Sequence, residues 1–221
     1  MTHQPSTRAN RIAYLETELW KAYYHRQWLR EFRLLIATHR EFFHMGPLTA
    51  VRASYESARA AMAFAPLDAS DLPKARRYLL TYYPRVRRSL GCRMSAAELA
   101  GVELNYWVVH RAAARRRLAE VASGRPANDE PTPAEIEPVV DAFAHLHAAL
   151  FNQTPERMRE SAVYRAQATA VVDRISGRYS PDVPGDWRRV EALLRQAYAA
   201  IEEAVGPDAV AWRGRPAIKP S

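Results

Sequence analysis

The chain has 221 residues, 48% hydrophobic and 25% charged, which is enough to bury one sizeable core and crowded for two full domains. These fractions exclude a disordered or fibrous chain, and the single cysteine, Cys92, excludes an intrachain disulfide and a cysteine-based zinc site. No run reaches the about 18 apolar residues that span a bilayer, and the first residues lack the apolar core of a secretion signal. We therefore expect a soluble, cytoplasmic protein without a membrane partner.

The formal net charge of +8 does not by itself indicate nucleic-acid binding. Only Lys21, Lys74 and Lys219 are lysines among 32 basic residues, and so strong a preference for arginine is typical of GC-rich coding sequence. The arginine clusters are scattered along the chain, at 76–77, 87–88, 115–117 and 188–189. A nucleic-acid surface needs such clusters on one face, so we do not expect a nucleic-acid partner.

The first predicted element is one long amphipathic helix over 8–44. Its aromatic and aliphatic residues, from Tyr14 to Phe43, recur at helical spacing, and arginines occupy the opposite side. The Gly-Pro pair at 46–47 ends this helix and starts a second one, rich in alanine, that continues to about Phe64.

Two further helices follow. Asp71 is a candidate N-cap for a third helix of about twenty residues, which Pro84 is expected to kink or divide. Ser95 and Glu98 form a capping-box pattern that opens a fourth helix, ending near Gly124.

The segment 123–133 contains glycine, three prolines, asparagine and two acids, and is predicted to be the main exposed linker. Thr132 and Glu135 form a second capping-box pattern, which starts a fifth helix to about Phe151.

A sixth helix is predicted from Thr154-Pro155 to about Gly177, and Asp186 is the expected cap of a seventh helix to about Val205. Strand patterns are nearly absent. The prediction is therefore an all-α protein: a single helical domain over 1–205, built as one bundle of about seven helices, and a flexible Pro- and Gly-containing tail over 206–221.

The most specific pattern is a pair of inward-facing polar residues that occurs twice. In the first helix Glu18 and His25 lie seven residues apart on the apolar side, which also carries His39. In the fourth helix Glu103 and His110 repeat the same spacing. Seven residues correspond to two helical turns, or about 10.5 Å along one face.

A carboxylate and an imidazole at this spacing can converge on a metal cluster between helices, because both side chains are long and such a cluster spans about 3.5–4 Å. Two more residues could complete the site: Glu56 on the second helix and His147 within the apolar stripe of the fifth. The candidate metal ligands are thus Glu18, His25, Glu56, Glu103, His110 and His147. Alternatively, Glu18 pairs with Lys21 or Arg26 near solvent and the histidines are satisfied core residues.

With its helical plan, this Glu-x6-His pattern resembles the haem-oxygenase-like di-iron oxidases. In that family a later helix carries His-x3-Asp-x2-His, and at the matching spacing this chain has Glu103, Trp107 and His110. A tryptophan thus stands where the family has its central carboxylate. The resemblance implies a haem-oxygenase-like bundle, an iron or manganese cofactor, and dioxygen as co-substrate, with Glu18, His25, Glu56, Glu103 and His110 as ligands.

Substrate-binding candidates come from two places. Arg52 and Arg59 flank Glu56 on the second helix and are suited to carboxylates or phosphates if they face inward; the alternative is an ion-pair network within the helix. Tyr106 belongs to an aromatic group that forms core or walls a pocket for an apolar ligand.

The expected function is a small all-α enzyme with an active site of carboxylates and histidines between helices, acting on a small-molecule substrate. Metal-dependent oxidation is its most concrete version. The alternative is a non-catalytic helical module that binds a partner protein or an acidic polymer through arginine-rich faces. A homodimer is compatible with either hypothesis.

Overall fold

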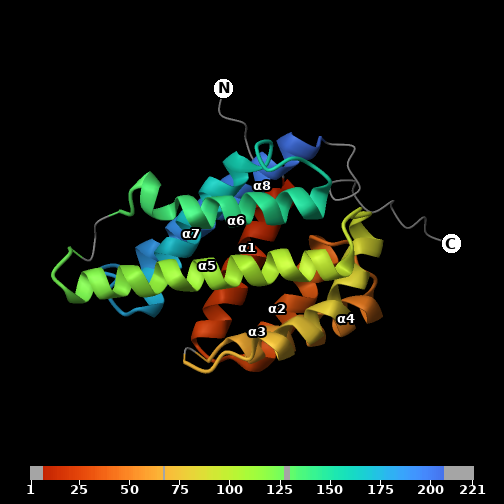
Figure 1. Ribbon diagram of the computed structural model, residues 1–221, viewed down its shortest axis with the longest axis horizontal. Helices are drawn as coiled ribbons and strands as arrows, with labels where there is room; N and C mark the ends of the chain where they lie inside the picture. The colour runs from red at the N-terminus through yellow and green to blue at the C-terminus, as the bar shows by residue number, and fades with distance from the viewer. Residues whose placement is uncertain (1–6, 67, 127–129, 207–221) are drawn as a thin grey trace.

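The computed structural model describes residues 7–66, 68–126 and 130–206, and these ranges contain eight α-helices and no strand (Figure 1). The all-α bundle predicted from the sequence is confirmed, with eight helices in place of seven. The helices are α1 (Thr7–Tyr24), α2 (Trp28–Glu41), α3 (Pro47–Phe64), α4 (Leu72–Leu90), α5 (Ala96–Ala122), α6 (Pro133–Phe151), α7 (Arg159–Ser176) and α8 (Val183–Val205).

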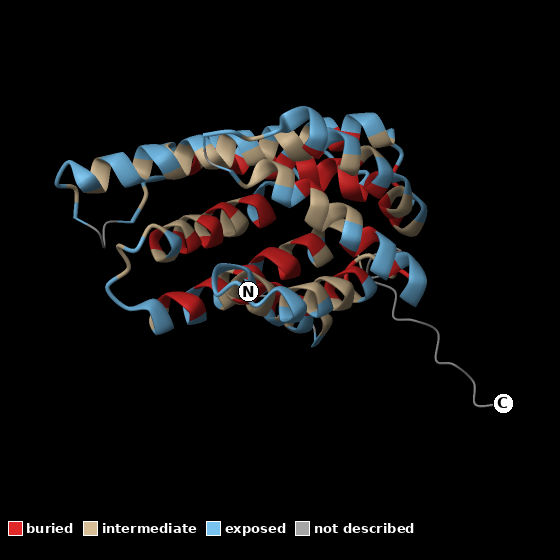
Figure 2. Cartoon of the chain, turned by 90° about the horizontal axis from the view of Figure 1, so that it is seen from below, coloured by how far each residue is buried: buried red, intermediate tan, exposed pale blue. Residues whose placement is uncertain are grey.

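The helices follow one another around a closed circuit. Each helix packs against the next in the chain, and α8 returns to pack against α1. The longest helix, α5, runs along the front of the molecule in Figure 1, with α6 on one side of it and α3 and α4 on the other. Most buried residues lie where the helices face one another (Figure 2), and one connected cluster of buried side chains extends from α1 to α8. None of the described helices is long and apolar enough to cross a membrane.

The prediction of one continuous helix over 8–44 is wrong, because the chain turns between Tyr24 and Trp28. Arg26 adopts a left-handed conformation with φ of 55°. The N–H of Gln27 donates to the carbonyl of Ala22 (2.8 Å) and that of Arg26 to the carbonyl of Tyr23 (3.0 Å). These two bonds form a Schellman motif, which ends a helix and usually has glycine where this chain has Arg26. Because arginine stands in place of that glycine, the turn could not be predicted from the residue pattern.

Proline at position 84 does not divide its helix, since α4 continues from Leu72 to Leu90 with Pro84 inside. The predicted cap of this helix is confirmed, because the Asp71 side chain accepts a hydrogen bond from the Lys74 N–H (2.9 Å). Both predicted capping boxes, at Ser95 and at Thr132, are also present with their reciprocal bonds.

The last two helices begin elsewhere than predicted. The residues before Arg159 form turns, so α7 starts after the predicted Thr154-Pro155 position. The N-cap of α8 is Asp182, whose side chain accepts from the Gly185 N–H (3.0 Å), and not Asp186. Asp186 lies in the first turn of α8, where it is buried and paired with Arg174.

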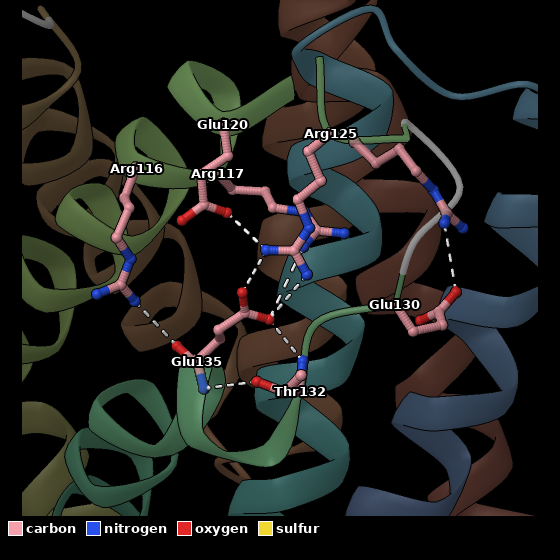
Figure 3. Close-up of polar contacts among 8 residues, drawn as sticks. Arg116, Arg117, Glu120, Arg125, Glu130, Thr132 and Glu135 are labelled. Carbon is pink, nitrogen blue, oxygen red and sulfur yellow. Dashed lines mark hydrogen bonds and ion pairs between the residues drawn. The ribbon is translucent and has the colours of Figure 1, made fainter. Parts of the chain in front are cut away.

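Ion pairs hold the described part of the predicted linker against the bundle (Figure 3). Arg125 lies between Glu120 and Glu135 and donates to both, at 2.6 Å to Glu120. At the other end Glu130 accepts from Arg189 and Arg174. Residues 127–129 lie outside the described ranges, as does the predicted tail after Gly206.

A charged pair is buried near the middle of the bundle. Arg165 of α7 donates through both terminal nitrogens to the carboxylate of Glu16 of α1, at 2.9 Å for the Nη1 bond. Tyr198 of α8 donates to the same carboxylate and accepts from Arg165 (3.2 Å). The Glu16 side chain is 8% exposed and the Arg165 side chain 17%. These three residues therefore join α1, α7 and α8 through one hydrogen-bonded cluster.

We expect Arg26→Gly to raise the free energy of unfolding by about 1 kcal/mol, because glycine adopts the left-handed conformation without the steric cost of a Cβ. Urea unfolding measures this difference. Gly124→Ala is the matched control: Gly124 has φ of 104° and no atom within 4 Å of an added Cβ, so that substitution should destabilise through the backbone alone. A destabilised Arg26→Gly variant would contradict this account of the turn.

We expect Glu16→Gln to lower the free energy of unfolding by about 3–5 kcal/mol, because it leaves the Arg165 charge buried without a counter-charge. Urea unfolding again provides the measurement. Glu137→Gln removes an ion pair to Arg159 in which both side chains are more than 40% exposed, so it should leave stability near the wild-type value. Equal changes in the free energy of unfolding for the two substitutions would show that the buried pair stabilises the fold no more than an exposed pair does.

Candidate active site

A histidine and an aspartate meet between α5 and α7. The Nε2 atom of His110 lies 3.1 Å from each carboxylate oxygen of Asp173. A carboxylate only accepts hydrogen bonds, so Nε2 carries the hydrogen and donates it. Nδ1 has no hydrogen-bond partner among the described residues, and in the neutral ring it keeps a lone pair.

The surroundings of His110 favour its charged form. Burial by itself would lower the pKa of this imidazole, but the Asp173 charge and the hydrogen bond to it outweigh burial, and the net effect raises the pKa above its usual value. The ring of Tyr106 stacks on the imidazole, with centroids 5.8 Å apart and planes 11° from parallel. The stacked Tyr106 ring therefore fixes the plane of the imidazole, and the hydrogen bond to Asp173 fixes the direction of Nε2.

The pair borders an open cleft of about 480 Å³. Aromatic side chains from three parts of the chain form much of its wall: Tyr23 and Tyr24 at the end of α1, Phe64 at the end of α3, and Trp107 on α5. Its remaining lining residues are Ala61, Ala65, His110, Arg111, Ala114, Arg115, Leu118, Asp173, Ser176 and Gly177. We call this space the His110 cleft. A much smaller cavity of about 50 Å³, beneath the anchored linker, also borders His110 and Asp173.

A second, more apolar hollow of about 660 Å³ adjoins the His110 cleft, and the two share Tyr23, Ala61 and Ala65. It lies against α2 and α3, and its other lining residues are Trp28, Glu31, Phe32, Leu35, Ala58, Met62 and Pro66. Trp28 and Met62 are 59% and 69% exposed, which is unusual for side chains of this size. Together the two hollows offer an apolar molecule a long surface that leads to the histidine.

Three of the predicted site residues lie on α5: Glu103, Tyr106 and His110. Glu103 accepts a hydrogen bond from the Tyr83 hydroxyl (2.6 Å), and burial raises the pKa of its carboxyl group. Tyr106 packs against Phe143, with ring centroids 4.1 Å apart, as well as against His110. Tyr106 thus packs beside the histidine but is not among the residues that line the cleft, and Glu103 pairs with a tyrosine.

The predicted ligand His147 is a buried core histidine. Its Nδ1 lies 2.8 Å from the Ser161 hydroxyl, and burial lowers the pKa of the imidazole to about 3. His39 is similar: Nδ1 lies near the Leu35 carbonyl and the Ser54 hydroxyl, and burial lowers its pKa to about 4. Both rings are neutral at physiological pH, and each has a ring nitrogen hydrogen-bonded to a neighbouring polar group.

The first predicted pair, Glu18 and His25, is separated by the turn after α1. Glu18 binds Lys21 (2.7 Å) and also Arg30 of α2, so the solvent-side pairing with Lys21 is the observed alternative. His25 lies in the turn itself and is exposed. The turn changes the helical register, and the two side chains do not share the inward face that a continuous helix would give them.

The cluster around Glu56 does not form an inward anion pocket. Glu56 pairs with Arg85 of α4 (3.1 Å), and burial raises the pKa of its carboxyl group. Arg52 is exposed, and Arg59 donates to the Tyr78 hydroxyl (2.7 Å) while its guanidinium lies over the Tyr78 ring. The pairing of Glu56 runs between helices, not within α3 as the alternative expectation had it.

The six candidate ligands do not come together. Across residues 7–66, 68–126 and 130–206, no group of three or more His, Cys, Asp or Glu side chains could hold a metal ion. Of the candidate ligands, Glu103 is hydrogen-bonded to Tyr83, His147 to Ser161 and His110 to Asp173. The side chains present therefore do not fit a di-iron centre, and a metal-dependent reaction stays a prediction of the sequence alone.

Comparison with known proteins does not add an assignment: no family model, no curated protein sequence and no solved structure matches the chain. The candidate site consequently depends on its own geometry.

Sequence reasoning missed three residues that define the site and its support. Asp173 stands near the end of α7, without a local motif, and contacts a histidine 63 residues away. Glu16 and Arg165, 149 residues apart, form the buried pair, whereas the pattern drew attention to Glu18. The available signal was a charged residue on the apolar side of a helix, Glu16 on α1 and Arg165 on α7. The sequence does not show which helices are neighbours, so it could not show that these two residues pair.

We expect acid to destabilise the protein in part through His147. In the unfolded chain its pKa is near 6.5, and in the folded protein about 3, so between these values the unfolded state binds more protons and stability falls as pH falls. His147→Gln should therefore reduce the slope of unfolding free energy against pH between pH 6 and 4 by up to about 1.4 kcal/mol per pH unit. Urea unfolding at several pH values measures the slope; the exposed His145→Gln is the control, and an unchanged slope in His147→Gln would contradict a buried neutral ring.

Proposed function

We propose that the protein is an enzyme that binds a small, largely apolar molecule in the His110 cleft and transfers a proton with His110. The observation that carries this proposal is the His110–Asp173 pair at an aromatic-walled cleft, in which Nδ1 has no hydrogen-bond partner within the described parts of the chain. Oriented imidazoles with a carboxylate on the far nitrogen are effective general bases, because the carboxylate fixes the tautomer and stabilises the imidazolium that forms.

The proposed chemistry follows from the two ring nitrogens. In the neutral ring, Nε2–H donates to Asp173, and the lone pair of Nδ1 accepts a proton from the bound molecule. The imidazolium then has a carboxylate at Nε2 and Tyr106 against its face. In the reverse direction the same Nδ1–H donates a proton. Asp173 is a positioning residue, since it acts through His110.

The cleft supports an apolar substrate more than a polar one. Aromatic rings from α1, α3 and α5 form its walls, and the adjoining hollow extends the apolar surface. Such sites take ligands of drug-like size and orient them with a few polar groups. The proposal keeps the expected enzyme with an active site between helices, and the histidine and carboxylate it invokes belong to α5 and α7.

The alternative function, binding of a partner protein or acidic polymer through arginine faces, has weaker support. Many arginines are already paired with carboxylates of the same chain, among them Arg30, Arg85, Arg125, Arg159, Arg165, Arg174, Arg189 and Arg195. Each such pair reduces the charge that an external acidic partner would meet.

The test uses 5-nitrobenzisoxazole, a flat apolar molecule whose ring opens to a coloured phenolate when a base removes its one acidic proton. We expect the wild-type protein to accelerate this opening about tenfold or more over His110→Gln, a variant that can still hydrogen-bond Asp173. The rate is followed by the absorbance of the phenolate. His145→Gln, which changes an exposed histidine on α6, is the matched control and should behave as wild type. Equal rates in wild type and His110→Gln would overturn the proposal.

The pH profile tests the role of Asp173. The rate should increase with pH as His110 loses its proton, and the midpoint should lie above the usual pKa of histidine because Asp173 raises that pKa. Asp173→Asn removes the negative charge, so the midpoint should move to lower pH. A midpoint that does not move would show that Asp173 has no electrostatic role in the reaction.

A further inference from the structure

The His110 cleft carries more positive than negative charge. Arg111 and Arg115, one helical turn apart on α5, both line it, and Asp173 is its one acidic lining residue. Asp173 is hydrogen-bonded to His110, so its charge is directed to the imidazole. The two arginines therefore leave a net positive potential at the α5 side of the cleft.

Arg111 is held in place by neutral groups only. Its guanidinium donates to the carbonyls of Ala65 (3.4 Å) and Pro66 (3.2 Å) and to the Ser70 hydroxyl, and it lies 3.6 Å over the Phe64 ring. No described carboxylate pairs with it. These contacts secure the end of α3, which is a structural role, but carbonyl and hydroxyl oxygens do not neutralise the cation, and they occupy three of its five N–H donors.

The second cation adds to the potential. Arg115 pairs with Asp68 at 3.5 Å, but the Arg115 side chain is 52% exposed and that of Asp68 fully exposed, so water and salt weaken this pair. Burial and the nearby Arg115 charge both lower the pKa of Arg111. An anion bound between the two guanidinium groups would relieve their repulsion.

We propose that the ligand of the His110 cleft is an organic anion: an apolar body that lies along the aromatic walls, with a negatively charged group bound by Arg111 and Arg115. This inference rests on the proposed function and names its substrate class. The acidic lining residue of the adjoining hollow, Glu31, sets the orientation, because it disfavours the anionic end there and favours it at α5. Planar, charged guanidinium groups are well suited to carboxylates, sulfonates and phosphates.

Two fluorescent probes with the same aromatic skeleton test the inference. Anilinonaphthalene sulfonate is an anion, and N-phenyl-1-naphthylamine is uncharged; both brighten in apolar sites. We expect both to bind, and the anion about tenfold more tightly. Arg111→Gln should weaken the anion about tenfold and leave the uncharged probe unchanged, whereas Arg111→Lys, which keeps the charge, should restore much of the affinity. Raised salt should weaken only the anion.

Two controls locate the effect. Ala114→Trp fills the cleft and should abolish binding of both probes, whereas Arg33→Gln removes an exposed arginine of α2 and should change neither. If both probes bind and Arg111→Gln affects neither, the anion inference is overturned while the cleft stands. If neither probe binds, or if both still bind to Ala114→Trp, the proposed cleft fails and the inference fails with it.

Discussion

The buried pair between Glu16 and Arg165 is the contact on which the arrangement of the helices depends. A guanidinium in the interior is tolerated only where a carboxylate meets it with good geometry, so α1 and α7 must come together at this point. The Tyr198 hydroxyl adds α8 to the same cluster. The pair also fixes the face that α7 turns inward, and about two turns further along that helix Asp173 reaches His110 on α5.

The described histidines show how environment decides the role of one residue type. His39 and His147 are surrounded by hydroxyls, carbonyls and apolar rings, so burial lowers their pKa values and they remain neutral. His110 is also largely buried but has a carboxylate on Nε2, and its pKa is raised. The carboxylate of Asp173, together with a side chain that is 24% exposed, separates His110 from the two core histidines and favours its charged form.

Much of the fold could be predicted because helix signals are local. The capping boxes at Ser95 and Thr132 and the apolar periodicity need only a few neighbouring residues to be recognised. The site could be predicted only in part: the repeated pattern points to Glu103 and His110 as candidate ligands, but their observed partners Tyr83 and Asp173 lie 20 and 63 residues away. Such pairings follow from tertiary packing, which no local pattern contains.

The turn that the sequence did not reveal is also what shapes the cleft. In a continuous helix Trp28 would lie one turn beyond Tyr24 on the same stripe and continue along the bundle. Because Arg26 takes a left-handed conformation, the chain reverses, and Tyr23 contacts both Tyr24 and Trp28, with ring centroids 5.1 and 6.4 Å apart. These rings gather where the two hollows meet, and Tyr23 borders both. The two copies of the Glu-x6-His pattern therefore have different surroundings. The turn leaves His25 exposed to solvent, whereas α5 continues without a break and His110 lines the cleft.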